Sequence, residues 1–216
     1  MFETIQGEGV FTGVPAVFIR LQVCPVGCAW CDTKQTWDAN DDDQRDFGTI
    51  IIKTSDSPTW CLADAAQIIE QYYEQGFTAK HIVITGGEPC IYDLKPLTEQ
   101  FEAIGCQCQI ETSGTFEVKT SQRTWVTVSP KIAMKGKLDI ISSAIARANE
   151  IKHPVGTEKD IENLHQLLND MPHEKDLVIA LQPISQKSRA TQLCIDTCIK
   201  YNWRLSIQTH KYLNIA

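Results

Sequence analysis

The feature that most constrains the fold is a regular alternation of short apolar segments with longer amphipathic ones. The expected strands are Ala16–Val23, His81–Thr85, Gln107–Glu111, Trp125–Val128, Glu150–His153, Leu177–Leu181 and Arg204–Ile207. The expected helices are Leu62–Gln75, Leu94–Ile104, Asp139–Ala148, Glu158–Asn169 and Arg189–Tyr201. This order predicts an α/β fold with six or seven mainly parallel strands joined by right-handed crossovers.

Each expected strand is followed by a polar or Gly/Pro-containing cluster, such as Thr85-Gly86-Gly87-Glu88-Pro89 after the second strand. Turns are polar in most proteins, so one such cluster means little. In (β/α) barrels, however, the carboxyl ends of the strands converge on the active site. A closed barrel usually needs about 250 residues, whereas this chain has 216. We therefore expect a partial, incomplete barrel forming one domain over 1–216.

Residues 38–60 do not fit the alternation and are interpreted as an insertion within that domain. The segment contains four aspartates in a short stretch: Asp41, Asp42, Asp43 and Asp46. Such a charge run is most simply a solvated surface.

Composition excludes several classes of function. The net charge of -7 and the lack of a basic stripe argue against a nucleic-acid partner. No apolar run approaches the roughly 18 residues of a membrane helix, and the first residues do not resemble a signal peptide. These observations predict a cytoplasmic protein without a membrane partner. Nine cysteines in a reducing compartment indicate metal ligands, catalytic groups or core residues.

Cys24, Cys28 and Cys31 form a C-x3-C-x2-C motif directly after the first expected strand. A four-iron cluster held by protein alone needs four thiolates, so three would leave one iron open to another ligand. Zinc would need a fourth cysteine or histidine nearby. The spacing thus favours a [4Fe–4S] cluster over structural zinc or plain packing. The pairs Cys106/Cys108 and Cys194/Cys198 each share one face and are expected in the core.

This spacing resembles that of the radical S-adenosylmethionine (SAM) superfamily. The resemblance implies that SAM chelates the open iron and is cleaved by one electron to a 5′-deoxyadenosyl radical. It also implies the residues that bind SAM: Trp30, Cys31, Asp32, Gly87, Ser129, Pro130, Lys131, Gln182, Pro183, Ile184 and Ser185.

Within the superfamily, the chain resembles the 7-carboxy-7-deazaguanine synthases, in the form found in enterobacteria. The matching motifs span the whole chain: Ile5-Gln6-Gly7-Glu8-Gly9, Thr12–Ala16, Phe18–Leu21, Cys31-Asp32-Thr33, Glu111–Thr115, Gln182–Ser185 and Gln208–Tyr212. The resemblance implies a lyase that converts 6-carboxy-5,6,7,8-tetrahydropterin to 7-carboxy-7-deazaguanine with loss of ammonia, on the route to queuosine. It further implies a requirement for Mg²⁺, an electron donor such as flavodoxin, and a homodimer.

Arg20 is a charged residue in an otherwise apolar strand, and a guanidinium inside a barrel must find an anion. The carboxylate of the pterin is the expected partner; the alternative is a structural pair with Glu8 or Asp32. Thr33 is expected to bind Mg²⁺, with capping of the next turn as the alternative.

The resemblance also places Ile5, Gln6, Gly7 and Thr85 against the pterin ring, and it assigns no catalytic side chain. The terminal carboxylate of Ala216 is expected to reach the substrate, with Tyr212, Leu213 and Ile215 packed over the opening. The alternative is a tail packed on the outer helices.

Two other functions remain open on the sequence. A glycyl-radical activase would share the cysteine spacing, although it would not need Arg20 or the Gln6–Gly9 segment. A non-catalytic binding module on the same scaffold is disfavoured by the intact cysteine motif and Gly86-Gly87-Glu88.

Overall fold

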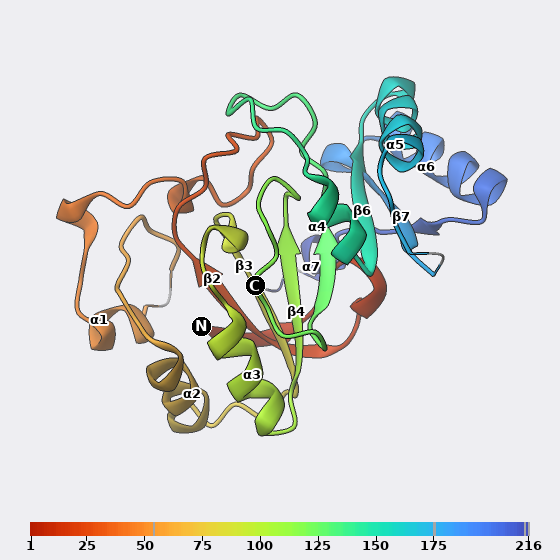
Figure 1. Ribbon diagram of the computed structural model, residues 1–216. Helices are drawn as coiled ribbons and strands as arrows, with labels where there is room; N and C mark the ends of the chain where they lie inside the picture. Colours follow the sequence, from red (N-terminus) through yellow and green to blue (C-terminus); the bar gives the residue numbers. More distant parts are fainter. Residues whose placement is uncertain (54, 175, 214, 216) are drawn as a thin grey trace.

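The computed structural model describes residues 1–53, 55–174, 176–213 and 215 (Figure 1). Over these residues it contains one eight-stranded sheet with the strands in chain order. The strands are β1 (Phe2–Ile5), β2 (Pro15–Leu21), β3 (His81–Gly86), β4 (Gln107–Thr112), β5 (Trp125–Val128), β6 (Glu150–Val155), β7 (Val178–Pro183) and β8 (Arg204–Leu205). All neighbours from β2 onward are parallel, and β1 is antiparallel to β2.

The helices are α1 (Phe47–Ile51), α2 (Ala65–Glu74), α3 (Lys95–Ala103), α4 (Ser142–Arg147), α5 (Glu158–Asp170), α6 (Ser188–Tyr201) and α7 (Thr209–Leu213). Helices α2 to α6 contribute to the apolar core on one face of this curved sheet, whereas α7 lies at the cavity. Short 3₁₀ turns are η1 (Gly9–Phe11), η2 (Lys34–Thr36), η3 (Asp41–Asp43), η4 (Pro89–Ile91) and η5 (Ile184–Gln186). Figure 1 shows α2 and α3 side by side below the sheet, and α5 and α6 together beside β6 and β7.

Alternation along the strands separates two environments. In β4, Cys108 and Ile110 belong to the apolar core, which also includes Phe101 of α3. Gln109 lies between them and points to the opposite face, where its Nε2 donates to Thr127 Oγ1 (3.0 Å). Since successive side chains of a strand point to opposite faces, β4 is apolar on the helix-covered face and polar on the concave face.

The sheet is an open, incomplete barrel, because β1 and β8 form its edges and do not pair with each other in the described part of the chain. Residues near the two chain ends lie across this gap. The Thr209 amide donates to Gly7 O (2.9 Å), and the Gly9 amide donates to Ser206 Oγ (2.9 Å). The Val10 amide donates to Glu150 Oε1 (3.0 Å). Side chains and loops therefore close the side that the sheet leaves open.

The predicted α/β class, parallel order and incomplete barrel are confirmed. The seven expected strands and five expected helices all occur, with ends shifted by a few residues. The strand missed by the prediction is β1, so the sheet has one strand more than expected. Within the segment 38–60, the Ile50-Ile51-Ile52 run contributes to α1, which is N-capped by Asp46 through the Thr49 amide (3.0 Å). No helix in the described residues is long and apolar enough to cross a membrane.

Candidate active site

A cavity of about 530 Å³ opens at the carboxyl ends of the strands. It brings together nearly all the site residues predicted from sequence: Ile5, Gln6, Gly7, Arg20, Cys24, Cys28, Trp30, Cys31, Asp32, Thr33, Thr85, Gly87, Ser129, Lys131, Gln182, Pro183, Ile184 and Ser185. Pro130 is not among the lining residues, and Ala216 lies outside the described residues. The convergence expected for strand ends in a barrel is therefore present.

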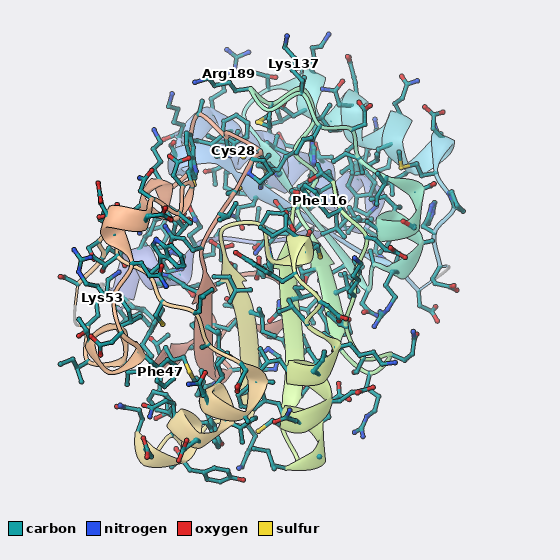
Figure 2. All side chains as sticks on the ribbon, turned by 60° about the vertical axis from the view of Figure 1, so that its left-hand side comes forward. Cys28, Phe47, Lys53, Phe116, Lys137 and Arg189 are labelled. Atoms are coloured by element: carbon teal, nitrogen blue, oxygen red, sulfur yellow. The ribbon has the colours of Figure 1, made fainter. Side chains whose placement is uncertain are left out.

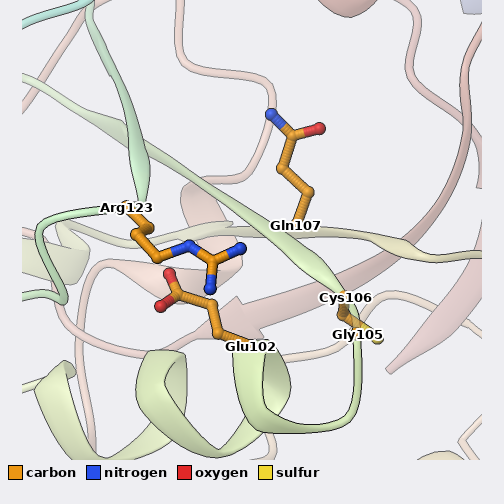
Figure 3. A pocket seen from close by; sticks show the side chains of 5 residues that line it. All are labelled: Glu102, Gly105, Cys106, Gln107 and Arg123. Atoms are coloured by element: carbon orange, nitrogen blue, oxygen red, sulfur yellow. The ribbon is translucent and has the colours of Figure 1, made fainter.

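A smaller hollow of about 330 Å³ lies at the start of β4 and is shown in Figure 3. It is lined by Glu102, Gly105, Cys106, Gln107 and Arg123. None of the predicted site residues contributes to it. The chemistry implied by the sequence therefore belongs to the larger cavity.

The loop after β2 carries the three cysteines. Its start is fixed by the Cys24 amide, which donates to Trp37 O (2.9 Å), and its end by Trp37 Nε1, which donates to Cys31 Sγ (3.3 Å). On the other side, the Gly136 amide donates to Val26 O (3.0 Å). Figure 2 accordingly shows Cys28 and Lys137 toward the same end of the molecule. The loop is held from two sides, and its three thiols line one cavity.

This arrangement fits a four-iron cluster better than a single metal ion. Among the described residues, no three His, Cys, Asp or Glu side chains are grouped so as to hold one ion. Thiolates of a cluster bind different irons, so a tight single-ion group is not required. Burial raises the pKa of the Cys24 and Cys28 thiols, and for Cys28 the charge of Lys131 opposes this effect. A metal group bound here would stabilise the Cys24 and Cys28 thiolates against this burial.

The remaining cysteines are separate from the cavity. Cys90, Cys106, Cys108, Cys194 and Cys198 are buried, and Cys61 is half-buried. Burial raises the pKa of Cys90, Cys108 and Cys194 to about 12. Buried thiols of this kind are inert core residues, as the sequence predicted for Cys108 and Cys194.

The Gly86-Gly87 pair brings the end of β3 against the start of the cysteine loop. The Gly87 amide donates to Leu21 O (2.7 Å), and the Glu88 amide donates to Val23 O (2.8 Å). A Cβ on Gly87 would lie 2.1 Å from Val23 O, and Gly86 has a φ of 111°. Both positions therefore require glycine, one for close approach and the other for its backbone conformation.

Glu88 fixes the next strand end, a role that the sequence reasoning missed. The side chain is buried, with 2% exposed. Its carboxylate accepts from Thr112 Oγ1 (2.6 Å), the Ser113 amide (2.8 Å) and the Cys90 amide (3.0 Å). In the sequence, the polar cluster Glu111-Thr112-Ser113-Gly114 was the only indication that Glu88 has hydrogen-bond partners at this strand end.

Lys152 is a second residue that the sequence reasoning missed. Its buried Nζ donates to Glu8 Oε2 (2.7 Å) and also to Glu111 Oε2. Burial opposes its charge, but the two carboxylates outweigh burial and raise the pKa of Lys152. For Glu8, burial is likewise outweighed by Lys152 and by hydrogen bonds, so its pKa is lowered to about 2. Lys152 and Glu8 are therefore both charged on the floor of the cavity.

The same network orders the segment before η1. Gln6 Nε2 donates to Glu111 Oε1 (3.3 Å), and the Glu8 amide donates to Gln6 Oε1 (3.1 Å). Gln208 Nε2 donates to Glu8 Oε1 (2.7 Å). A Cβ on Gly7 would lie 2.4 Å from His210 Nδ1. The Gln6–Gly9 segment is thus clamped between the sheet interior and the end of the chain.

Arg20 lines the cavity, but it is not buried as predicted. Its side chain is 32% exposed, and Nη1 lies 2.6 Å from Asp56 Oδ1. The carboxylate paired with Arg20 is thus Asp56 and not Glu8 or Asp32, the two named as alternative partners, and Phe2 lies under the guanidinium at 5.0 Å. Arg20 lies on the face of β2 that points toward the open mouth of the cavity. Strand alternation predicts on which face a residue lies, but not whether that face is enclosed or open to solvent.

The tail differs in part from expectation. Tyr212 and Leu213 are 66% and 60% exposed, so the prediction that they pack over the opening is wrong. His210, Lys211 and Ile215 line the cavity.

Comparison with known proteins agrees with this geometry. No family model matches the chain. The chain is 60% identical over 216 residues to the 7-carboxy-7-deazaguanine synthase of Escherichia coli (strain K12), covering 100% of this chain and 97% of the relative. It is 37% identical to the synthase of Flavobacterium psychrophilum, covering 99% and 90%. The crystal structure of QueE from Escherichia coli superposes with a TM-score of 0.93 at 59% identity, covering 96% of this chain and 91% of that one. With a site of the expected composition and relatives at this level over at least 90% of their length, the chain belongs to the 7-carboxy-7-deazaguanine synthase family.

Proposed function

We propose that the protein is a radical SAM lyase that converts 6-carboxy-5,6,7,8-tetrahydropterin to 7-carboxy-7-deazaguanine with release of ammonia. The observation that carries this is the single cavity into which the cysteine loop, the Gly86-Gly87 turn and the Gln6–Gly9 segment all face. Family membership supports the same reaction. The product is a precursor in queuosine biosynthesis.

Cys24, Cys28 and Cys31 would hold a [4Fe–4S] cluster. When bound, cluster and SAM together supply the hydrogen-abstracting 5′-deoxyadenosyl radical. The residues proposed to bind SAM are Trp30, Cys31, Asp32, Gly87, Ser129, Pro130, Lys131, Gln182, Pro183, Ile184 and Ser185. Trp30 is 41% exposed and can offer its ring face to the adenine. Lys131 Nζ donates to Ser129 Oγ (2.6 Å), and this hydrogen bond positions Nζ at the cavity wall.

Ile5, Gln6, Gly7, Arg20, Thr85 and Ala216 are proposed to bind the pterin, and Thr33 to bind Mg²⁺. The clamped Gln6–Gly9 segment presents backbone groups in a fixed position, so little ordering is needed when the ring binds. We also propose a cytoplasmic homodimer reduced by a carrier such as flavodoxin. The free cysteines favour such a reducing compartment.

Arg20→Lys tests the carboxylate clamp together with the reaction. Lysine keeps the charge but loses the planar fork that binds a carboxylate through two hydrogen bonds. We expect kcat/KM for the carboxypterin to fall about tenfold or more, the cost of a charge-assisted hydrogen bond. The measurement is deazaguanine formation after anaerobic reconstitution with iron, sulfide, SAM, reductant and Mg²⁺. Cluster absorption and SAM affinity should be unchanged; near-normal kinetics would remove Arg20 from the substrate site.

Thr33→Ala tests the proposed Mg²⁺ ligand. Thr33 Oγ1 lies 3.3 Å from Gly86 O and 3.6 Å from Cys31 Sγ, so its hydroxyl is next to both the cluster loop and the SAM turn. Loss of one oxygen ligand should raise the Mg²⁺ concentration for half-maximal activity severalfold while the dissociation constant for SAM stays constant. Thr33→Ser keeps the hydroxyl and should restore the Mg²⁺ titration. An identical titration in all three proteins would reject the assignment.

A further inference from the structure

The guanidinium of Arg20 already has a carboxylate partner in this structure. Asp56 Oδ1 lies 2.6 Å from Arg20 Nη1, and both residues line the main cavity. Phe2 lies under the guanidinium and stacks on Phe18 with a ring-centroid separation of 5.4 Å. Phe2 thus supports one face of the guanidinium, and Asp56 is bound at Nη1.

Asp56 comes from the segment 38–60 and not from the barrel. The turn that carries it is held by Lys53 Nζ, which donates to Ser57 O (2.8 Å) and Thr59 O (3.3 Å). Gln22 Nε2 donates to Pro58 O (3.4 Å), which connects the turn to the end of β2. The segment therefore delivers a carboxylate to the mouth from outside the sheet.

This ion pair is suited to being exchanged. The side chain of Asp56 is 61% exposed, and that of Arg20 is 32% exposed. Exposed pairs contribute little to stability, because water competes for both charges. The Lys152 pairs on the cavity floor are the contrasting case, since the Lys152 side chain is only 4% exposed. The pair at the mouth can thus open when another carboxylate arrives.

We propose that Asp56 is a built-in carboxylate that competes with the substrate's carboxylate for Arg20. This inference rests on the proposed function, in which Arg20 binds the pterin carboxylate. A ligand that also contacts the Gln6–Gly7 and Thr85 side of the cavity displaces Asp56, because its ring interactions add to the ion pair. A small carboxylate without a ring faces the same competition and has no ring contacts to offset it.

The test is Asp56→Asn, assayed with the reconstituted enzyme. Removal of the competitor should lower KM for the carboxytetrahydropterin about two- to fivefold, the range of an exposed ion pair, with kcat unchanged. The inhibition constant of tetrahydropterin, which lacks the carboxylate, should stay the same. Asp42→Asn is the matched control, since it removes the same charge from an exposed residue of the same segment that does not line the cavity.

Three results would each overturn the proposal. One is a KM that is unchanged or higher in Asp56→Asn, which would make Asp56 a neutral or supporting partner of Arg20. Another is an equal fall of KM in Asp42→Asn, which would indicate a general charge effect. The third is an equal gain in affinity for tetrahydropterin.

In an Arg20→Met background, Asp56→Asn should have no effect on KM. Failure of the proposed function is a separate outcome, because the unmodified enzyme would then form no deazaguanine.

Discussion

Replacement of Cys28 by Ala should abolish both the iron–sulfur chromophore and reductive cleavage of SAM, and the same holds for Cys24 and Cys31. Each thiol is one of three on a single loop facing one cavity, and the other cysteines do not line that cavity. A lost ligand leaves a second iron without a protein thiolate, and a cluster with only two protein ligands is not retained. Iron and sulfide content after anaerobic reconstitution, and 5′-deoxyadenosine formation, are the measurements.

Cys106→Ala and Cys194→Ala are the matched controls. Both residues are buried in the apolar core, with 4% and 0% exposed. Each substitution should lower the free energy of unfolding somewhat, as expected for a small loss of buried volume. Iron content and SAM cleavage should remain at the level of the unmodified protein. Loss of the chromophore in Cys106→Ala would contradict the ligand assignment.

Lys152→Met should lower the free energy of unfolding by about 3–5 kcal/mol, the usual cost of removing one partner from a buried ion pair. Methionine matches the length of the lysine stem, but it leaves Glu8 and Glu111, which are 17% and 16% exposed, without their cation. This is a large share of the roughly 5–15 kcal/mol that stabilises a typical domain. Chemical denaturation at neutral pH gives the difference. Lys95→Met removes an exposed pair with Glu99, whose side chain is 54% exposed, and should change stability by less than about 0.5 kcal/mol.

The pH dependence of this loss separates charge from packing. The pKa of Glu8 is lowered from an ordinary value of 4.5 to about 2, so its stabilising contribution is complete above pH 4.5 and is lost as the pH falls toward 2. In Lys152→Met the cation that lowers the pKa of Glu8 is missing, whereas burial, which raises that pKa, remains, so the pKa of Glu8 is higher in the variant than in the unmodified protein. As the pH falls, Glu8 is therefore protonated at a higher pH in the variant than in the unmodified protein. The difference in free energy of unfolding between the two proteins should then shrink below about pH 5. A deficit independent of pH would mean that lost packing is responsible.

The sheet was predictable because periodicity along β3 to β7 reports directly on burial. Segments such as Ile82–Ile84 are apolar on both sides, which is the signature of a strand covered on both faces. The extra strand β1 was missed because Phe2–Ile5 has only four residues and pairs with β2 without a tight hairpin turn. A strand this short leaves little local pattern.

The cysteine loop and the glycine turn were predictable because their chemistry requires particular residue types at fixed spacings. The role of Lys152 was not predictable, although Glu150 and Lys152 are two polar residues on one face of β6. Its partners Glu8 and Glu111 are 144 and 41 residues away, and only the fold brings them together. The exposure of Arg20 and its pairing with Asp56 depend on how the segment 38–60 returns to the mouth, which no periodic signal describes.

The gap between β1 and β8 also has a consequence for the order of events during synthesis. The hydrogen bonds that fix the Gln6–Gly9 segment span 197 residues to Ser206, 200 to Gln208 and 202 to Thr209. A ribosome makes the cysteine loop early in synthesis, and these partners emerge much later. Contacts between such distant residues form slowly, because the loop-closure entropy is lost before the contacts stabilise the chain. Cys24, Cys28 and Cys31 are therefore synthesised well before the contacts that hold the Gln6–Gly9 segment can form.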